Sequence, residues 1–165
     1  MELLKGNITT FEADVIVTAA NSFLRGGGGV DGAIHKAAGP KLLEELQRFN
    51  GCKTGDAVIT NAYNLKAKYV IHAVGPIYKD GKSGEGELLA AAYEKSILLA
   101  KSVDAESILF PAISTGLYGY PPKPALNIAI DSIHKACKKN ETKMKVTMVC
   151  FDQETYQLMS NLLEI

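Results

Sequence analysis

The chain has 165 residues, of which 47% are hydrophobic, and its 18 basic side chains (Lys and Arg) are balanced by 18 acidic ones (Asp and Glu). This length is sufficient for one domain whose hydrophobic core needs neither disulfides nor a structural metal. A formal net charge of zero lacks the basic excess of proteins that bind nucleic acid by neutralising phosphates, so nucleic acid is not expected as a partner.

The cysteines and the lengths of the apolar runs indicate the cellular compartment in which the protein is expected. The three cysteines, Cys52, Cys137 and Cys150, have no CxxC spacing, so neither a disulfide framework nor a structural zinc site is expected. No apolar run approaches the ~20 residues that cross a bilayer, and the N-terminus lacks a basic segment followed by an apolar stretch. We therefore expect no membrane partner and a cytoplasmic location.

Short β-branched apolar runs alternate with helical patterns, which predicts an α/β fold with a largely parallel sheet. In chain order, the predicted strands are residues 1–5, 14–20, 56–62, 68–74, 107–113 and 145–151. Helices are predicted over residues 40–51, 87–103 and 122–139, and a last one from about Gln153 with Asp152 as its N-cap. The glycine-rich segment 75–86 is predicted to be a mobile loop.

Two predicted strand-to-helix junctions carry glycine-bearing loops, "NSFLRGGGGVDGAIHKAAG" (21–39) and "ISTGLYGYPP" (113–122). A helix N-terminus presents free backbone N–H groups and partial positive charge, and glycine allows a ligand close to the backbone, so both junctions are predicted to bind phosphate. The first loop matches GxGxxG but lacks the acidic residue that ends the next strand of a dinucleotide fold, and neither loop has a Walker lysine. This favours a diphosphate held by backbone donors.

The same residues resemble a known family. The blocks "ADVIVTAANSFLRGGGGVDGAIHKAAG", "YVIHAVGP" and "ISTGLYGYP" are similar to those of macro domains, specifically the MacroD-type subclass of O-acetyl-ADP-ribose deacetylases and mono-ADP-ribosyl hydrolases. With "LKGNIT" near the start and "VCFDQETYQLMSNLLEI" at the end, the resemblance covers residues 1–165 as a single macro domain. It implies a three-layer α/β/α sandwich around a mixed six-stranded sheet, with ADP-ribose in a cleft at its edge.

The resemblance also implies roles for individual residues, with no cofactor and no metal. The implied catalytic residues are Asp31, at the reacting end of the ligand, and Asn21, on the distal ribose. The implied ligand-binding residues are Asn7 and Ile8 at the adenine edge, Phe151 against the adenine, Gly28, Gly29 and Val30 on one side of the diphosphate, and Ser114, Thr115, Gly116, Leu117 and Tyr118 on the other, where Tyr118 also covers the distal ribose. The chain departs from the family pattern at Asn7, Thr18 and Arg25, where aspartate, asparagine and an apolar residue are usual.

Hydrolysis of an ADP-ribose ester needs an oriented water, a proton acceptor and stabilisation of developing negative charge. Asp31 is the only acid in the glycine loop, so we predict hydrolysis of O-acyl-ADP-ribose or of mono-ADP-ribosylated proteins. A non-catalytic ADP-ribose reader and an RNA-associated module remain alternatives, although the retained carboxylate argues against the first and the absence of a basic stripe against the second. Two roles of Asp31 stay open: it acts as the general base, or it only orients water beside a ligand phosphate.

Several of these residues also have purely structural interpretations. Asp31 is compatible with a helix cap, Asn21 with a turn, and the two aromatic residues, Tyr118 and Phe151, with ordinary packing. His35 follows Asp31 by four residues and is interpreted as a packed or capping residue, and His72, in mid-strand, as a core residue.

Overall fold

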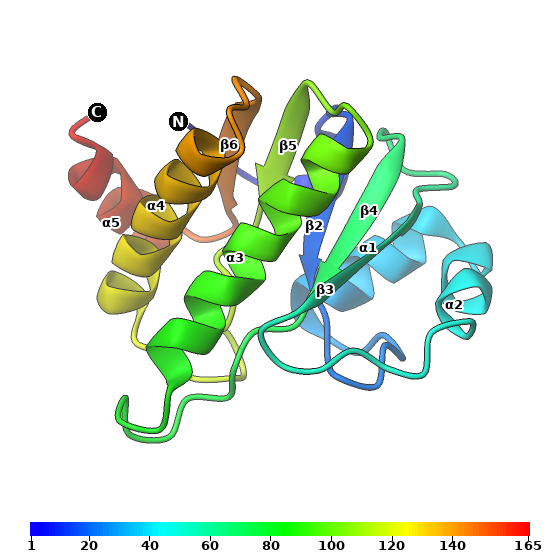
Figure 1. Ribbon diagram of the computed structural model, residues 1–165, viewed down its shortest axis with the longest axis horizontal. Coiled ribbons are helices and arrows are strands. Elements are labelled where there is room, and N and C mark those ends of the chain that lie inside the picture. Colours follow the sequence, from blue (N-terminus) through cyan, green and yellow to red (C-terminus); the bar gives the residue numbers. More distant parts are fainter.

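The computed structural model describes residues 1–165 and contains one six-stranded sheet with helices on both faces (Figure 1). The strands are β1 (Glu2–Lys5), β2 (Val15–Ala19), β3 (Ala57–Asn61), β4 (Tyr69–Ala73), β5 (Ser107–Phe110) and β6 (Lys145–Cys150). Their spatial order is β1-β6-β5-β2-β4-β3, and every neighbouring pair is parallel except β3 with β4. The predicted mixed six-stranded sheet is confirmed.

Strand β2 shows how the core forms on both faces of the sheet. Its residues Val15 and Val17 belong to the apolar cluster under α3 (Glu85–Ser102) and α4 (Pro122–Lys139), which lie side by side in Figure 1. The residue between them, Ile16, packs instead in the cluster that includes Ile34 of α1 (Gly29–Ala38) and Leu42 of α2 (Lys41–Leu46). Successive side chains of a strand point to opposite faces, so a continuous apolar run is what a central strand between two helical layers requires.

Two predicted elements end earlier than expected. The predicted strand 107–113 stops at Phe110, because Pro111 has no N–H to donate to a neighbouring strand. The predicted helix 40–51 stops at Leu46 and continues only as turns, whose last bond joins the Phe49 N–H to the Leu46 carbonyl. In contrast, α4 has its predicted bounds, and α5 (Gln153–Leu163) begins after the predicted N-cap, Asp152, whose carboxylate accepts the Thr155 N–H at 2.7 Å.

The glycine-rich segment 75–86 forms a loop as far as Gly84, but one carboxylate organises it. The buried Glu85, the first residue of α3, accepts hydrogen bonds of 2.7–3.0 Å from the backbone N–H groups of Lys79, Asp80, Gly81 and Ser83. These bonds lower the pKa of Glu85 to about 2. The loop is therefore held together by internal hydrogen bonds that its composition did not indicate.

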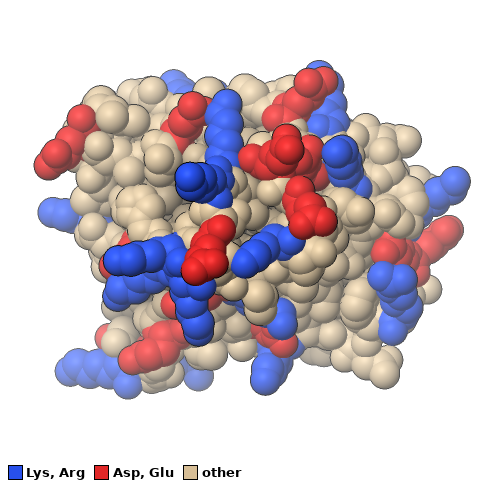
Figure 2. Space-filling model, turned by 45° about the horizontal axis from the view of Figure 1, so that its top comes forward, with Lys and Arg blue, Asp and Glu red and all other residues tan.

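On the face shown in Figure 2, basic and acidic side chains are interspersed, in keeping with the zero net charge. None of the helices is both long enough and apolar enough to span a bilayer.

Candidate active site

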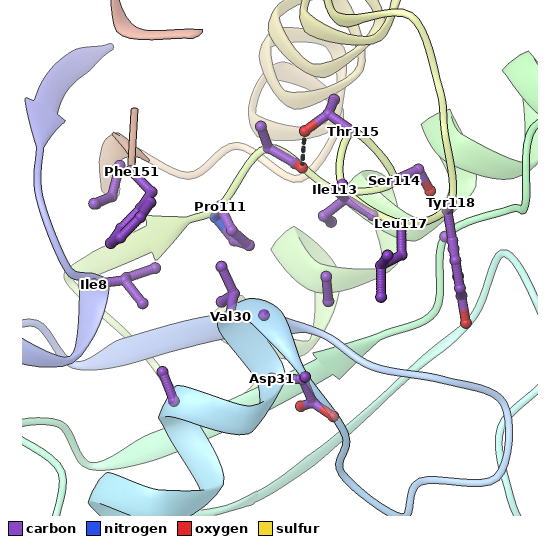
Figure 3. Close-up of a pocket in the computed structure, with 18 of the residues that line it drawn as sticks. Ile8, Val30, Asp31, Pro111, Ile113, Ser114, Thr115, Leu117, Tyr118 and Phe151 are labelled. Carbon is purple, nitrogen blue, oxygen red and sulfur yellow. Dashed lines mark hydrogen bonds between the residues drawn. The ribbon is translucent and has the colours of Figure 1, made fainter. Parts of the chain in front are cut away.

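A cleft of about 670 Å³ opens where the carboxyl ends of β2, β5 and β6 meet the following loops. Parallel α/β sheets place ligand sites at this edge, and the volume is that of a small-molecule site. Every residue predicted for the site lines this one cleft: Asn7, Ile8, Asn21, Gly28, Gly29, Val30, Asp31, Ser114, Thr115, Gly116, Leu117, Tyr118 and Phe151. Figure 3 shows the two junctions facing each other across it.

The glycine loop leads into helix α1, whose N-terminus faces the cleft. Gly26 and Gly29 have φ values of +76° and +61°, which side chains rarely adopt, so glycine is required there by the backbone as well as by any ligand. Helix α1 starts at N-cap Gly28 with no side chain capping it. The N–H groups of its first residues therefore have no acceptor within the protein and form a site for an anion.

The second junction, residues 113–120, is tied to the loop that precedes α3. Ser114, at a φ of +68°, donates its hydroxyl to the Pro76 carbonyl at 2.8 Å, and the Tyr78 N–H donates to the Tyr118 carbonyl at 2.8 Å. A side chain at Gly75 would place its Cβ 2.3 Å from Ser114 Oγ. Close backbone approach thus fixes the wall of the cleft that is opposite the glycine loop.

The side chains of Asn21 and Asn7 both form hydrogen bonds within the protein. Asn21 accepts the Phe23 N–H at 3.0 Å and donates to the Gly26 carbonyl at 2.8 Å, so it shapes the glycine loop as the turn interpretation expects. The Asn7 oxygen accepts both the N–H and the hydroxyl of Thr9, at 3.0 and 2.7 Å, and caps the 3-10 helix η1 (Ile8–Thr10). Their contacts with ribose and adenine stay predictions.

Asp31 lies in the first turn of α1 with only 5% of its surface exposed. Its Oδ1 accepts the Thr18 hydroxyl at 2.9 Å, whereas Oδ2 has no protein partner. Burial raises the pKa of Asp31 above its usual range, while the Thr18 hydrogen bond and the nearby His35 act in the opposite direction. A carboxylate with one fixed oxygen, one free oxygen and a raised pKa is suited to accept a proton.

Thr18 is the residue that the sequence interpretation missed. It was noted only as a departure from the family pattern, yet it is fully buried and makes the one hydrogen bond to the carboxylate of Asp31. The sequence feature that could have identified Thr18 is its position in the strand, where its side chain points to the face opposite that of Val17. His72 is buried, which confirms its interpretation as a core residue.

Exposed apolar side chains border the cleft. Phe151 and Leu117 are 73% and 97% exposed, so neither contributes to the core. Ordinary packing therefore does not account for Phe151, and an exposed ring at the rim of a cleft is typical of a ligand contact.

Known proteins resemble the chain over nearly its whole length. The family model for the macro domain matches residues 17–129. The O-acetyl-ADP-ribose deacetylase 1 of Pantoea vagans is 50% identical over 165 residues, which cover 98% of this chain and 96% of that protein. The Oceanobacillus iheyensis macrodomain with ADP superposes with a TM-score of 0.93 at 40% identity and covers 98% of this chain and 88% of that one. The Trypanosoma brucei macrodomain in complex with ADP-ribose has a TM-score of 0.91 at 39% identity and covers 98% and 68%. The chain belongs to the macro domain family.

Proposed function

We propose that the protein binds ADP-ribose in this cleft and hydrolyses esters of ADP-ribose, namely O-acetyl-ADP-ribose and mono-ADP-ribose linked to acidic side chains of proteins. The observation that carries the proposal is Asp31, a buried carboxylate with a free oxygen next to the open N-terminus of α1. The similar proteins include an O-acetyl-ADP-ribose deacetylase and a macrodomain in complex with ADP-ribose, which supports the proposal. The three free cysteines fit the reducing cytoplasm in which we place the protein.

Binding is assigned to the two facing junctions. The diphosphate would lie on the free N–H groups of Gly29 and Val30 and against the segment from Ser114 to Tyr118. The adenine would lie between Ile8 and the exposed ring of Phe151, and the distal ribose beside Asn21. Because backbone N–H groups hold the diphosphate, this binding needs no metal ion.

In the chemical step, Asp31 acts on the water that attacks the ester carbonyl. The hydrogen bond from Thr18 fixes Oδ1, so that Oδ2 faces the water and accepts its proton or holds it in line. Developing negative charge on the carbonyl oxygen is stabilised by backbone N–H groups of the two loops. ADP-ribose and the free acid are the products.

The test is hydrolysis of O-acetyl-ADP-ribose and of a glutamate-linked ADP-ribosyl protein, in EDTA, by the wild type and by Asp31→Ala. The variant should lose about 10²–10⁴-fold in turnover while its ADP-ribose affinity changes much less. Asp131→Ala removes an exposed carboxylate of α4 and is the matched control. Binding without hydrolysis by the wild type would make the protein a reader of ADP-ribose, and equal turnover of Asp31→Ala would leave that residue a structural partner of Thr18.

A further inference from the structure

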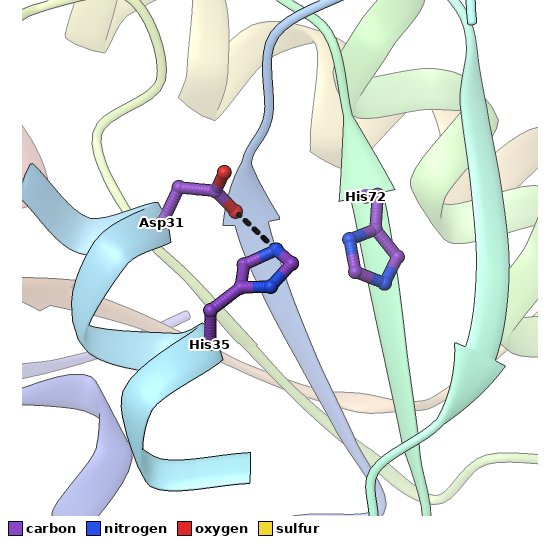
Figure 4. Close-up of side chains that lie close together, drawn as sticks. All are labelled: Asp31, His35 and His72. Atoms are coloured by element: carbon purple, nitrogen blue, oxygen red, sulfur yellow. Dashed lines mark ion pairs between the residues drawn. The ribbon is translucent and has the colours of Figure 1, made fainter. Parts of the chain in front are cut away.

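Asp31, which lines the cleft, belongs to a cluster of three side chains of the metal-ligand type, and the other two members, His35 and His72, do not line the cleft (Figure 4). Asp31 and His35 are one helical turn apart on α1, and His72 reaches them from β4. One ligand atom from each residue can be chosen so that all three lie within 4.8 Å of one another. We propose that these three residues form a binding site for a divalent transition metal ion of the Zn²⁺ type.

The first argument is a buried nitrogen that has no partner. Nε2 of His72 lies 2.9 Å from the Thr60 hydroxyl, which also lies 3.0 Å from the Asn61 carbonyl and can donate to that carbonyl while accepting from Nε2–H. The other nitrogen, Nδ1, is buried, has no hydrogen-bond partner, and carries a lone pair in this tautomer. A buried lone pair of this kind calls for a cation or a proton donor.

The second argument is distance. His35 Nε2 lies 3.6 Å from Asp31 Oδ1, too far for a hydrogen bond. Two ligands bound to one tetrahedral zinc ion at about 2.0–2.1 Å are about 3.4 Å apart. The spacing of this ion pair is therefore also close to that of two ligands on one shared ion, and the ligand atoms of all three residues lie within 4.8 Å of one another.

The third argument is the donor set. A helix that supplies two ligands at i and i+4, with a third from another element, is the arrangement of the zinc proteases. Two imidazoles and one carboxylate suit zinc and its neighbours rather than magnesium or calcium. The Thr18 hydroxyl on Asp31 and the Thr60 hydroxyl on His72 orient two of the three ligands, as outer partners do in metal sites.

The ion would sit between Asp31, which lines the cleft, and the two histidines, which do not, and its effect on catalysis rests on the proposed function. An ion bound at Oδ1 of Asp31 lowers the basicity of the whole carboxylate, including the Oδ2 that faces the water, so the ion should inhibit the hydrolysis that proceeds in EDTA. The site would then couple ADP-ribose ester turnover to the concentration of free transition metal. Metal binding itself can be measured whether or not the protein hydrolyses these esters.

The experiment measures Co²⁺ and Zn²⁺ binding to the untagged chain carrying Cys137→Ser, which removes the half-buried thiol as a competing ligand. His35→Gln and Asp31→Asn each delete one proposed ligand with little change of shape. The control is His134→Gln, because His134 is exposed on α4 and is the remaining histidine of the chain. Thermal unfolding in EDTA identifies any variant that is not folded.

We expect one ion per chain, a Co²⁺ spectrum without a thiolate charge-transfer band, and an affinity loss of more than about tenfold in both ligand variants. His134→Gln should bind as tightly as the parent. Added Zn²⁺ should inhibit hydrolysis by the parent, and EDTA should restore it. The site is refuted if folded His35→Gln and Asp31→Asn bind as the parent does, if no ion binds at all, or if the Co²⁺ spectrum shows sulfur ligation.

Discussion

Gly32→Ala tests the placement of the glycine loop without touching the ligand. A Cβ at residue 32 would lie 2.3 Å from the Gly27 carbonyl oxygen and 3.2 Å from its carbon. Real Cβ atoms essentially never lie closer than 3.0 Å to such an atom, so the loop and α1 must separate by 3.0 − 2.3 = 0.7 Å or more. The obstacle is backbone, so no side-chain rotation relieves it.

This displacement should weaken ADP-ribose binding and leave the protein folded. Because a misplacement of about 1 Å costs on the order of 100-fold in a positioned site, we expect an affinity loss of about 10- to 100-fold. Alanine is favoured over glycine inside a helix by up to about 1 kcal/mol, which offsets part of the strain in α1. The melting temperature should therefore change less than the affinity.

Calorimetric titration with ADP-ribose measures the affinity, and thermal unfolding of the same samples measures the melting temperature. Gly86→Ala is the matched control, since Gly86 lies in the first turn of α3 and its Cβ would meet Tyr120 and Ile128 at ordinary distances of 3.6 and 3.7 Å. Both variants gain the same helix propensity, but only one shifts the glycine loop. Equal affinities for the two would refute the assignment of the diphosphate to the N-terminus of α1.

Three further changes probe other parts of the molecule. Gly29→Glu should abolish ADP-ribose binding in a folded protein, because the carboxylate would occupy and repel the diphosphate and because a side chain strains the backbone at φ +61°; titration with a thermal-melt check would expose unchanged affinity. Asn7→Asp supplies a second, charged oxygen beside the one already bound to Thr9, so affinity for ADP-ribose should rise about fivefold, but not for the inosine analogue, which has no amine; an equal rise for both would contradict adenine recognition. Glu85 has a folded-state pKa of about 2, below its ordinary 4.5, so its stabilisation is present above pH 4.5 and is lost as the pH falls through about 2. The difference in melting temperature between wild type and Glu85→Gln should shrink over that range, and a constant difference would show that the loop bonds do not depend on this charge.

The fold was predictable because local patterns and layer architecture agree. The central strands are continuous apolar runs, and α4 and α5 have clear start signals in Pro122 and Asp152. One error is local, since Pro111 ends β5 early, and another arises where a tertiary contact overrides the pattern. The composition of segment 75–86 predicts that Glu85 belongs to a loop, because the sequence does not show that four backbone N–H groups converge on its carboxylate.

The cleft was predictable from its two junctions, whereas the surroundings of Asp31 were not. Alternation along β2 places Thr18 on the same face as Ile16, but the sequence does not say which helix covers that face. The fold supplies the answer, since Ile16 packs with Ile34 of α1, and Thr18 therefore reaches the carboxylate one turn before Ile34.

The same sheet register explains the position of His72. In the parallel pairing of β2 with β4, His72 is the partner of Thr18, so both side chains face α1. A strand histidine that looks like a core residue from its own neighbours is thus placed beside the helix that carries Asp31 and His35. Pairing between strands separated by some 50 residues is a property of the topology rather than of any local motif. For this reason the glycine block indicates a phosphate site from the sequence alone. The proximity of Asp31, His35 and His72, in contrast, follows only from the alignment of β2 with β4.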